Sequence, residues 1–385
     1  MKQKLLVITR WIVGALFTFS GFVKGIDPIG FQYKLNDYLE ALHIHFLGFL
    51  SFPGALLLPL AEFTIGITLL SGVLIRLSTK LTFLFMLFFT PLTFYIALKN
   101  PVTDCGCFGD ALVITNWQTF YKNIVLIVLA TLLLINRGNL HFIVSYKHRK
   151  IVFACLFVGY LSVVYWSYNH EPILDFRPYK VGVNITEGMK TPEGSATDVY
   201  KNIYHYRNLK SNEVKQFTDS DFPWQDTINW KFESMDPPLL LKKGYQPPIH
   251  DFSIQTIDKA NVTDLYLSDS LFSFFVIAYD LEKSSHRKQK ELNLLAEWAK
   301  GKGYHFIGLT STTGTQLNQY IQEQHPNYEI MLTDQIPLKT IIRSNPGLIL
   351  LRKGTIIRKW HYNDFPTVSE AESITRAEMN KKLNP

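Results

Sequence analysis

Long apolar stretches dominate the chain up to about residue 168, and they limit what this part can fold into. They occupy roughly residues 5–23, 55–75, 81–98, 117–135 and 151–166. Each is near the length that an α-helix needs to cross a hydrocarbon core about 30 Å thick. The first is too long for the core of a signal peptide and lacks a small-residue cleavage site, so we expect it to be retained. The sequence therefore predicts a helical membrane domain with five spans.

Basic residues set the expected orientation of these spans. They lie before the first span, between the second and third, and between the fourth and fifth. These positions share one side of a membrane that is crossed five times, and loops rich in Lys and Arg are cytoplasmic. We therefore expect an inner-membrane protein of a bacterium, in contact with lipid, with a cytoplasmic N-terminus and a periplasmic C-terminal region. The residues concerned are Lys2, Lys4, Arg76, Lys80, Arg137, Lys147, Arg149 and Lys150.

The loop between the third and fourth spans holds Cys105 and Cys107 in the sequence DCGCFGD, at residues 104–110. A disulfide between cysteines one residue apart closes a small, strained ring, and a strained disulfide is easily reduced. This favours a redox-active pair, with both cysteines as candidate catalytic residues. A structural disulfide and a metal site remain alternatives, and the metal site would need further ligands. Cys155 falls inside the fifth span, where we expect a buried apolar thiol.

Glu62 is the notable charge within the second span. An ionised carboxylate is costly in a membrane, so Glu62 must be protonated, paired or exposed to an aqueous cavity. Lys24, at the outer end of the first span, is a plausible partner. We take Lys24 and Glu62 as candidate binding residues. They either transfer a proton or bind a ligand, or they form a structural pair that fixes helix packing.

Several short motifs around these residues follow one another along the first two spans and the loop between them. They are Phe19-Ser20-Gly21-Phe22-Val23-Lys24, Asp27-Pro28, Tyr38-Leu39, Pro59-Leu60-Ala61-Glu62, Gly66 and Gly72. With the cysteine run, they resemble the DoxX superfamily of four-helix membrane proteins, and most of all the branch related to the methylamine-utilisation protein MauE. The resemblance covers residues 1–140, and the span at 149–168 is one extra helix. It implies a setting of periplasmic disulfide handling and redox-enzyme maturation rather than a defined reaction.

The rest of the chain has the composition of soluble protein. Residues 169–248 are rich in aromatic residues and proline, and we expect an extracytoplasmic linker with a small β element, formed by 200–207 and 213–218. Residues 249–385 predict a soluble α/β domain. Its expected strands lie at 251–254, 272–278, 306–310, 348–351 and 355–360, and its expected helices at 289–303 and 315–324.

This order of elements resembles the thioredoxin-like fold of thiol-disulfide reductases and peroxiredoxins. Pro346 stands where that fold carries its cis-proline, so it is a third candidate binding residue. The redox cysteines of the family would follow the strand that ends at Ala278, and the chain has none after Cys155. The resemblance thus implies a degenerate domain that lacks redox cysteines and is kept for binding or scaffolding.

Two functions follow from these features. The first is a redox-linked role in periplasmic protein maturation or assembly, in which the Cys-Gly-Cys loop performs thiol-disulfide exchange. The second is a non-enzymatic scaffold or assembly subunit of an envelope complex. Either role requires a periplasmic protein partner. The basic residues form no nucleic-acid pattern, no cofactor is evident, and a quinone is possible but unsupported. A transporter built on Glu62 is disfavoured because no inverted repeat is visible.

Overall fold

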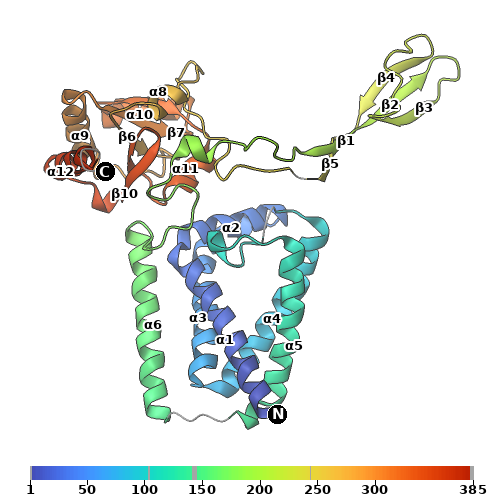
Figure 1. Ribbon diagram of the computed structural model, residues 1–385, viewed down its shortest axis with the longest axis vertical. Coiled ribbons are helices and arrows are strands. Elements are labelled where there is room, and N and C mark those ends of the chain that lie inside the picture. The colour runs from blue at the N-terminus through green and yellow to red at the C-terminus, as the bar shows by residue number, and fades with distance from the viewer. Residues whose placement is uncertain (1, 103–104, 141–144, 243, 382–385) are drawn as a thin grey trace. The chain divides into compact units, whose positions relative to one another are not determined.

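The computed structural model describes residues 2–102, 105–140, 145–242 and 244–381, so Asp104 of the cysteine run lies outside the described residues. The N-terminal part is a bundle of helices (Figure 1). Within the described ranges, five helical segments are long and apolar enough to cross a membrane. The helices are α1 (Lys2–Ile26), α2 (Pro28–Ala41), η1 (His45–Leu50), α3 (Ser51–Ser71), α4 (Ile75–Lys99), α5 (Asn116–Ile135) and α6 (Tyr146–Asn169).

Helices α1 and α3 approach each other closely because small residues lie along their contact. A Cβ atom added to Gly21 would lie 2.6 Å from the carbonyl oxygen of Pro59, and one added to Gly66 would lie 2.8 Å from the Cα atom of Thr18. Such close backbone approach is typical of helix packing in membranes, where apolar side chains gain nothing by leaving lipid. Arg10 of α1 adds a polar contact, since its guanidinium donates to the carbonyl of Leu69 near the end of α3.

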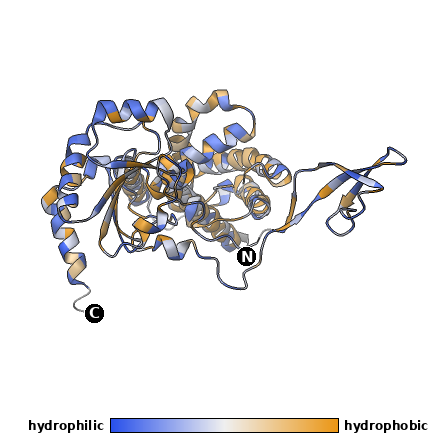
Figure 2. Ribbon diagram, turned by 90° about the horizontal axis from the view of Figure 1, so that it is seen from above, coloured by the Kyte–Doolittle hydropathy of each residue, from blue (hydrophilic) through white to orange (hydrophobic). Residues whose placement is uncertain are grey.

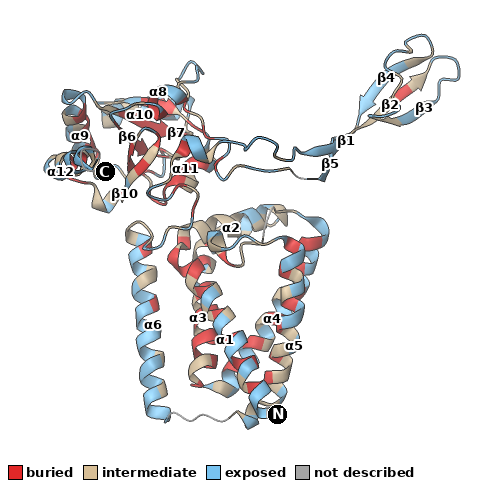
Figure 3. Ribbon diagram, viewed as in Figure 1, coloured by how far each residue is buried: buried red, intermediate tan, exposed pale blue. Residues whose placement is uncertain are grey.

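Helix α6 packs against the bundle through Tyr160, with Phe153 and Phe157 beside it. The ring of Tyr160 stacks on Phe63 with a centroid distance of 4.1 Å, and its hydroxyl donates to the carbonyl of Gly21. Most other residues of α6 are exposed (Figure 3). Cys155 is among them, so the expectation of a buried thiol was wrong. It lies on the outer face of a helix that contacts the bundle along one narrow line, where an apolar side chain meets lipid.

The five long segments of the bundle are predominantly apolar, and orange residues are visible on the bundle helices where Figure 2 views them from above. The second predicted span ended too late, because Gly72 has a φ of 72° and ends α3 in the left-handed conformation. Helix α2 was not predicted at all. Its start carries ordinary signals, since Asp27 accepts a hydrogen bond from the backbone of Gly30 and Pro28 occupies the first turn.

The C-terminal region is a thioredoxin-like α/β fold. Its five-stranded sheet has the order β10-β9-β6-β7-β8, in which β6, β7 and β8 are parallel and β9 is antiparallel to both β6 and β10. The strands are β6 (Phe272–Ile277), β7 (His305–Thr310), β8 (Glu329–Leu332), β9 (Gly347–Arg352) and β10 (Thr355–His361). The helices are α8 (Thr263–Leu267), α9 (Gln289–Gly301), α10 (Gly314–Gln324), α11 (Gln335–Ile341) and α12 (Val368–Asn380).

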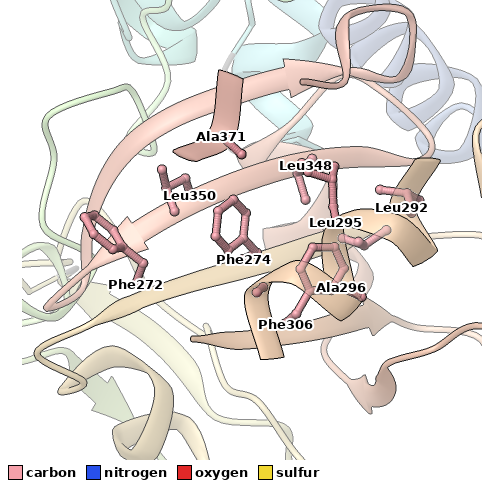
Figure 4. Packing of buried hydrophobic residues seen from close by; sticks show 11 residues of the cluster. Phe272, Phe274, Leu292, Leu295, Ala296, Phe306, Leu348, Leu350 and Ala371 are labelled. Atoms are coloured by element: carbon pink, nitrogen blue, oxygen red, sulfur yellow. The ribbon is translucent and has the colours of Figure 1, made fainter. Parts of the chain in front are cut away.

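The core of this fold lies between the sheet and helices α9 and α12 (Figure 4). Phe272, Phe274 and Leu350 are fully buried there, and Leu295 of α9 packs against them. The β-α-β unit and the closing hairpin were predicted, and the Asn345–Pro346 peptide bond is cis as expected. The predicted strand at 251–254 was wrong. Asp251 has a left-handed backbone with a φ of 60°. The nearest strand-like pairing is at Gln255, which forms isolated bridges.

Residues 185–250 form a second compact unit. It contains α7 (Ile185–Gly188), a three-stranded sheet of order β3-β2-β4 and a two-stranded β1-β5 sheet. The predicted pairing of segment 200–207 with segment 213–218 is confirmed for β2 and β3, since Tyr206 of β2 lies opposite Lys215 of β3. The ring of Tyr206 also contacts Phe217 and Phe232. The strands are β1 (Val199–Lys201), β2 (Ile203–Asn208), β3 (Val214–Thr218), β4 (Trp230–Met235) and β5 (Leu239–Lys242).

The contact between α1 and α3 predicts the effect of enlarging Gly21. Gly21→Ala forces a methyl group against the backbone of α3, and such overpacking typically costs about 1–3 kcal/mol. We expect a lower thermal midpoint for the detergent-solubilised protein. Gly159→Ala is the matched control, because a Cβ at this position of α6 meets nothing within 4 Å. Equal midpoints for the two variants would contradict the close packing.

Candidate functional site

The cysteine loop, defined as residues 105–110, connects α4 to α5 and brings the two thiols together. The Sγ atoms of Cys105 and Cys107 are 3.0 Å apart, and both residues are partly exposed thiols. Gly106 between them has a φ of 60°, a conformation that glycine adopts without a steric penalty. A Cβ at Gly106 would also lie 2.9 Å from Cγ of Lys34 on α2. Backbone freedom and close approach by α2 therefore both require glycine here.

Two hydroxyl groups from the bundle fix the backbone of this loop. Tyr38 of α2 donates to the carbonyl of Cys105 at 2.7 Å, and Ser20 of α1 donates to the carbonyl of Cys107 at 2.8 Å. The following residue, Phe108, is buried and lies 5.5 Å from the ring of Phe19. The positions of the two sulfurs are thus set by α1 and α2 rather than by the loop alone.

The surroundings of the two thiols make them chemically unequal. The hydrogen bond from Cys105 is the main cause that lowers the pKa of Cys107 to about 6, and the ammonium groups of Lys122 and Lys24 add to this effect against the opposing effect of burial. The same hydrogen bond and burial raise the pKa of Cys105. The thiolate is the reactive form of cysteine, so the lowered pKa favours Cys107 over Cys105 as the more reactive thiol at neutral pH.

Lys24 and Glu62 form a buried ion pair beneath this loop. The ammonium of Lys24 lies 2.7 Å from both carboxylate oxygens of Glu62, and both residues are 6% exposed. The hydroxyl of Ser20 lies 2.8 Å from Glu62 Oε2, in addition to its contact with the Cys107 carbonyl. The structure therefore pairs the two residues as the sequence predicted, and Ser20 links the pair to the backbone of Cys107.

A cavity of about 350 Å³ adjoins the cysteine loop. Its lining includes Gly106, Gly109 and Asp110 of the loop and, from the C-terminal region, Lys339 and Arg343. The volume lies at the lower end of the range of about 300–1,000 Å³ for small-molecule sites.

The third predicted site residue, Pro346, is not among the residues that line this cavity. Its neighbour Asn345 donates to the carbonyl of Asp280 and accepts from the backbone of Ser285. The cis-proline loop thus packs against the segment that replaces the redox cysteines of the fold.

Sequence reasoning missed the residues that join α2 to the C-terminal region. The Arg343 guanidinium contacts the carboxylate of Asp27 at 2.8 Å, and the hydroxyl of Tyr33 donates to that of Tyr279. These partners lie hundreds of positions apart in the chain. The helix-start signal at Asp27 could have revealed α2, but no sequence signal joins it to Arg343.

Residues 2–136 match the model of the family described as methylamine utilisation protein MauE, which confirms the predicted resemblance of the N-terminal region. No curated protein matches the sequence significantly.

Solved structures match the chain at low identity. A putative protein disulfide isomerase from Bacteroides thetaiotaomicron is 17% identical, with a TM-score of 0.27, over 35% of this chain and 87% of that one. A secreted disulfide oxidoreductase from Mycobacterium tuberculosis is 13% identical, with a TM-score of 0.25, over 33% and 96%. The bacterioferritin comigratory protein of Xanthomonas campestris is 11% identical, with a TM-score of 0.25, over 33% and 89%.

The inequality of the thiols predicts an order of modification. In a Cys155→Ala background, reduced protein should be alkylated by iodoacetamide first at Cys107, with a half-maximal rate near pH 6, because its pKa is lowered to about 6. Peptide mass spectrometry across a pH series measures this. Lys122→Gln should move the midpoint upward, whereas Lys80→Gln, an exposed lysine of α4, should leave it unchanged. A wild-type midpoint near 8.5, typical of a free cysteine, would refute the assignment.

The buried ion pair predicts unequal effects of removing its two members. Lys24→Met leaves the Glu62 carboxylate buried without its cation, which typically costs about 3–5 kcal/mol. Glu62→Gln keeps an acceptor for the ammonium and should cost less. Thermal unfolding in detergent compares the two variants, with Lys80→Met as the control. Equal and negligible effects would show that the pair does not stabilise the bundle.

Proposed function

We propose that the protein is a thiol-disulfide exchange protein of the bacterial inner membrane that acts in the maturation or assembly of periplasmic proteins. The observation that carries this proposal is the 3.0 Å approach of Cys105 and Cys107 in a loop held by α1 and α2. The cations near Cys107 support the proposal, because they favour its thiolate. The match of the N-terminal region to the MauE family is consistent with a redox role.

The proposed reaction has two steps, and its co-reactant is a disulfide of a client protein. The Cys107 thiolate attacks one client sulfur, the client S–S bond breaks, and the released client thiolate takes up a proton. Cys105 then loses its proton and attacks the Cys107 sulfur of the mixed disulfide. The second client thiolate leaves, so the client is reduced by two electrons and the Cys105–Cys107 pair is oxidised. The relative reduction potentials decide whether exchange runs in this direction or in reverse.

The C-terminal region takes no covalent part in this reaction, because the sequence contains no cysteine after Cys155. We propose that it positions the client. The expected orientation, with a cytoplasmic N-terminus, places this region and the cysteine loop together in the periplasm. A maleimide that cannot cross the membrane should then label Cys107 in cells whose outer membrane has been permeabilised, and the absence of labelling would refute this orientation.

The proposed reaction predicts different behaviour for the two cysteine variants. Cys105→Ser lacks the resolving thiol, so it should accumulate a mixed disulfide when the reduced protein is mixed with insulin. Cys107→Ser lacks the nucleophile and should accumulate little. Non-reducing electrophoresis and mass spectrometry measure the adduct, with Cys155→Ser as the control that behaves like wild type. Equal adduct from Cys105→Ser and Cys107→Ser, or none from either, would contradict the proposed roles.

The alternative function is a non-enzymatic scaffold, and one observation favours it. The segment Asp280–Ser285, which replaces the redox cysteines, is held by Asn345, which donates to the Asp280 carbonyl and accepts from the backbone of Ser285. In that case Cys105 and Cys107 only stabilise the loop. Their substitution by serine would then lower the abundance or thermal stability of the protein together with its function. In the exchange reaction, function is lost while abundance stays normal.

A further inference from the structure

The C-terminal region contacts α2 through the end of its sheet that carries the cis-proline. Strand β6 ends beside the start of β9, since Ile277 is paired with Gly347. Tyr279, which follows β6, and Arg343, which precedes the cis peptide bond, therefore lie at this one end. The bundle and the C-terminal region belong to the same compact unit. The end of the sheet at which the family's redox cysteines would stand is thus occupied by a helix of the same chain.

A bidentate ion pair forms the centre of this contact. Nε and Nη2 of Arg343 contact the Asp27 carboxylate at 2.9 and 2.8 Å, and the Arg343 side chain is 8% exposed. Gly30 makes room for this geometry, because a Cβ there would lie 2.7 Å from Arg343 Nη2. Beside it, the Tyr33 hydroxyl donates to Tyr279 at 2.8 Å.

The same arginine and the same helix also reach the cysteine loop. Nη2 of Arg343 lies 3.6 Å from the carboxylate of Asp110, the last residue of the loop. On α2, the side chain of Lys34 lies against Gly106, and Tyr38 donates to the Cys105 carbonyl. Docking of the C-terminal region and placement of the cysteines are therefore physically connected by two routes, one through α2 and one directly through Arg343.

We infer that Arg343 is a positioning residue for the Cys105/Cys107 pair, and that docking of the C-terminal region through Arg343 holds α2 and the cysteine loop in the geometry for thiol-disulfide exchange. This inference rests on the proposed function. It gives the thioredoxin-like region, which has no cysteine, a role in the reaction through its contact with the bundle. That role is independent of which client is used.

Electrostatics support this role. Burial alone would raise the pKa of Asp27, but the Arg343 guanidinium outweighs it and lowers that pKa. Burial raises the pKa of Asp110, and Arg343 opposes this rise. Without Arg343, Asp27 retains the attraction of Arg177, and Asp110 retains that of Arg177 and Lys34. Two carboxylates near the loop are then less well compensated, which disfavours a nearby thiolate.

The groups that act on Cys107 all belong to the bundle. They are Lys24 of α1, Glu62 of α3, Lys122 of α5 and Cys105 of the loop, and Tyr38 of α2 acts on Cys105. Replacing Arg343 removes none of these groups, so a shift in the reactivity of Cys107 reports either their displacement or the loss of the Arg343 charge.

The test uses the full-length reduced protein in a Cys155→Ala background. Arg343→Met should move the midpoint of Cys107 alkylation by iodoacetamide upward, because the cation beside Asp27 and Asp110 is lost and the loop is no longer held by the docked region. Arg343→Lys keeps the charge but not the bidentate geometry, so it should restore the midpoint only in part. Arg376→Met is the matched control, because Arg376 is an exposed arginine of α12, and it should keep the wild-type midpoint.

Two further results separate the possible failures. An unchanged midpoint in Arg343→Met, with a low wild-type midpoint, overturns the positioning role and leaves the exchange reaction intact. A wild-type midpoint near 8.5, typical of a free cysteine, overturns the lowered pKa of Cys107 on which the proposed function relies.

Tyr279→Phe is the second variant, used if Arg343→Met fails to accumulate. It removes only the hydroxyl contact with Tyr33. This variant should raise the rate of amide hydrogen exchange at residues 105–110. An unchanged exchange rate overturns the coupling through α2.

Discussion

The buried contact of Lys24 with Glu62 is the interaction on which the rest of the site depends. A charge placed inside a membrane bundle is costly unless it is paired. Here the two charges come from neighbouring helices and lie 2.7 Å apart. The pair therefore fixes the register of α1 against α3, which the glycines between them allow to approach closely. Ser20 extends the pair to the Cys107 carbonyl. One polar network thus determines both the packing of the bundle and the position of the nucleophile.

The cysteine loop combines a short spacing with support from outside. Only Gly106 separates the two cysteines, and its left-handed backbone conformation brings their sulfurs within hydrogen-bonding distance. The hydrogen bond between them lowers the pKa of Cys107 and raises that of Cys105, so two residues of the same type differ in reactivity. The ammonium of Lys122 favours the charge on Cys107. The difference between the thiols is therefore a property of the folded bundle and would be absent from the isolated peptide.

The sequence predicted the features that obey local rules. Apolar length revealed the five spans, alternation revealed the first strands of the small β unit, and the cost of a buried charge led to the pairing of Glu62 with Lys24. The β-α-β unit followed from the order of apolar strands and amphipathic helices, and the cis bond at Pro346 followed from the resemblance to thioredoxin-like proteins. Helix α2 was missed because its mixed composition gives no strong apolar face. The ion pair of Asp27 with Arg343 could not be predicted, since its partners are 316 positions apart and meet only when two folded parts dock.

This docking gives a thioredoxin-like fold without cysteines a role in the proposed exchange reaction. In an enzyme of that fold, one end of the sheet holds the nucleophile and the cis-proline together. Here the paired cysteines belong to the bundle, and the same end of the sheet contacts α2 through Arg343 and Tyr279. That surface therefore fits a helix instead of holding a cysteine. The absence of cysteines after Cys155 and their presence in the bundle are then two aspects of a single arrangement, in which the proposed chemistry and the positioning are assigned to different parts of one chain.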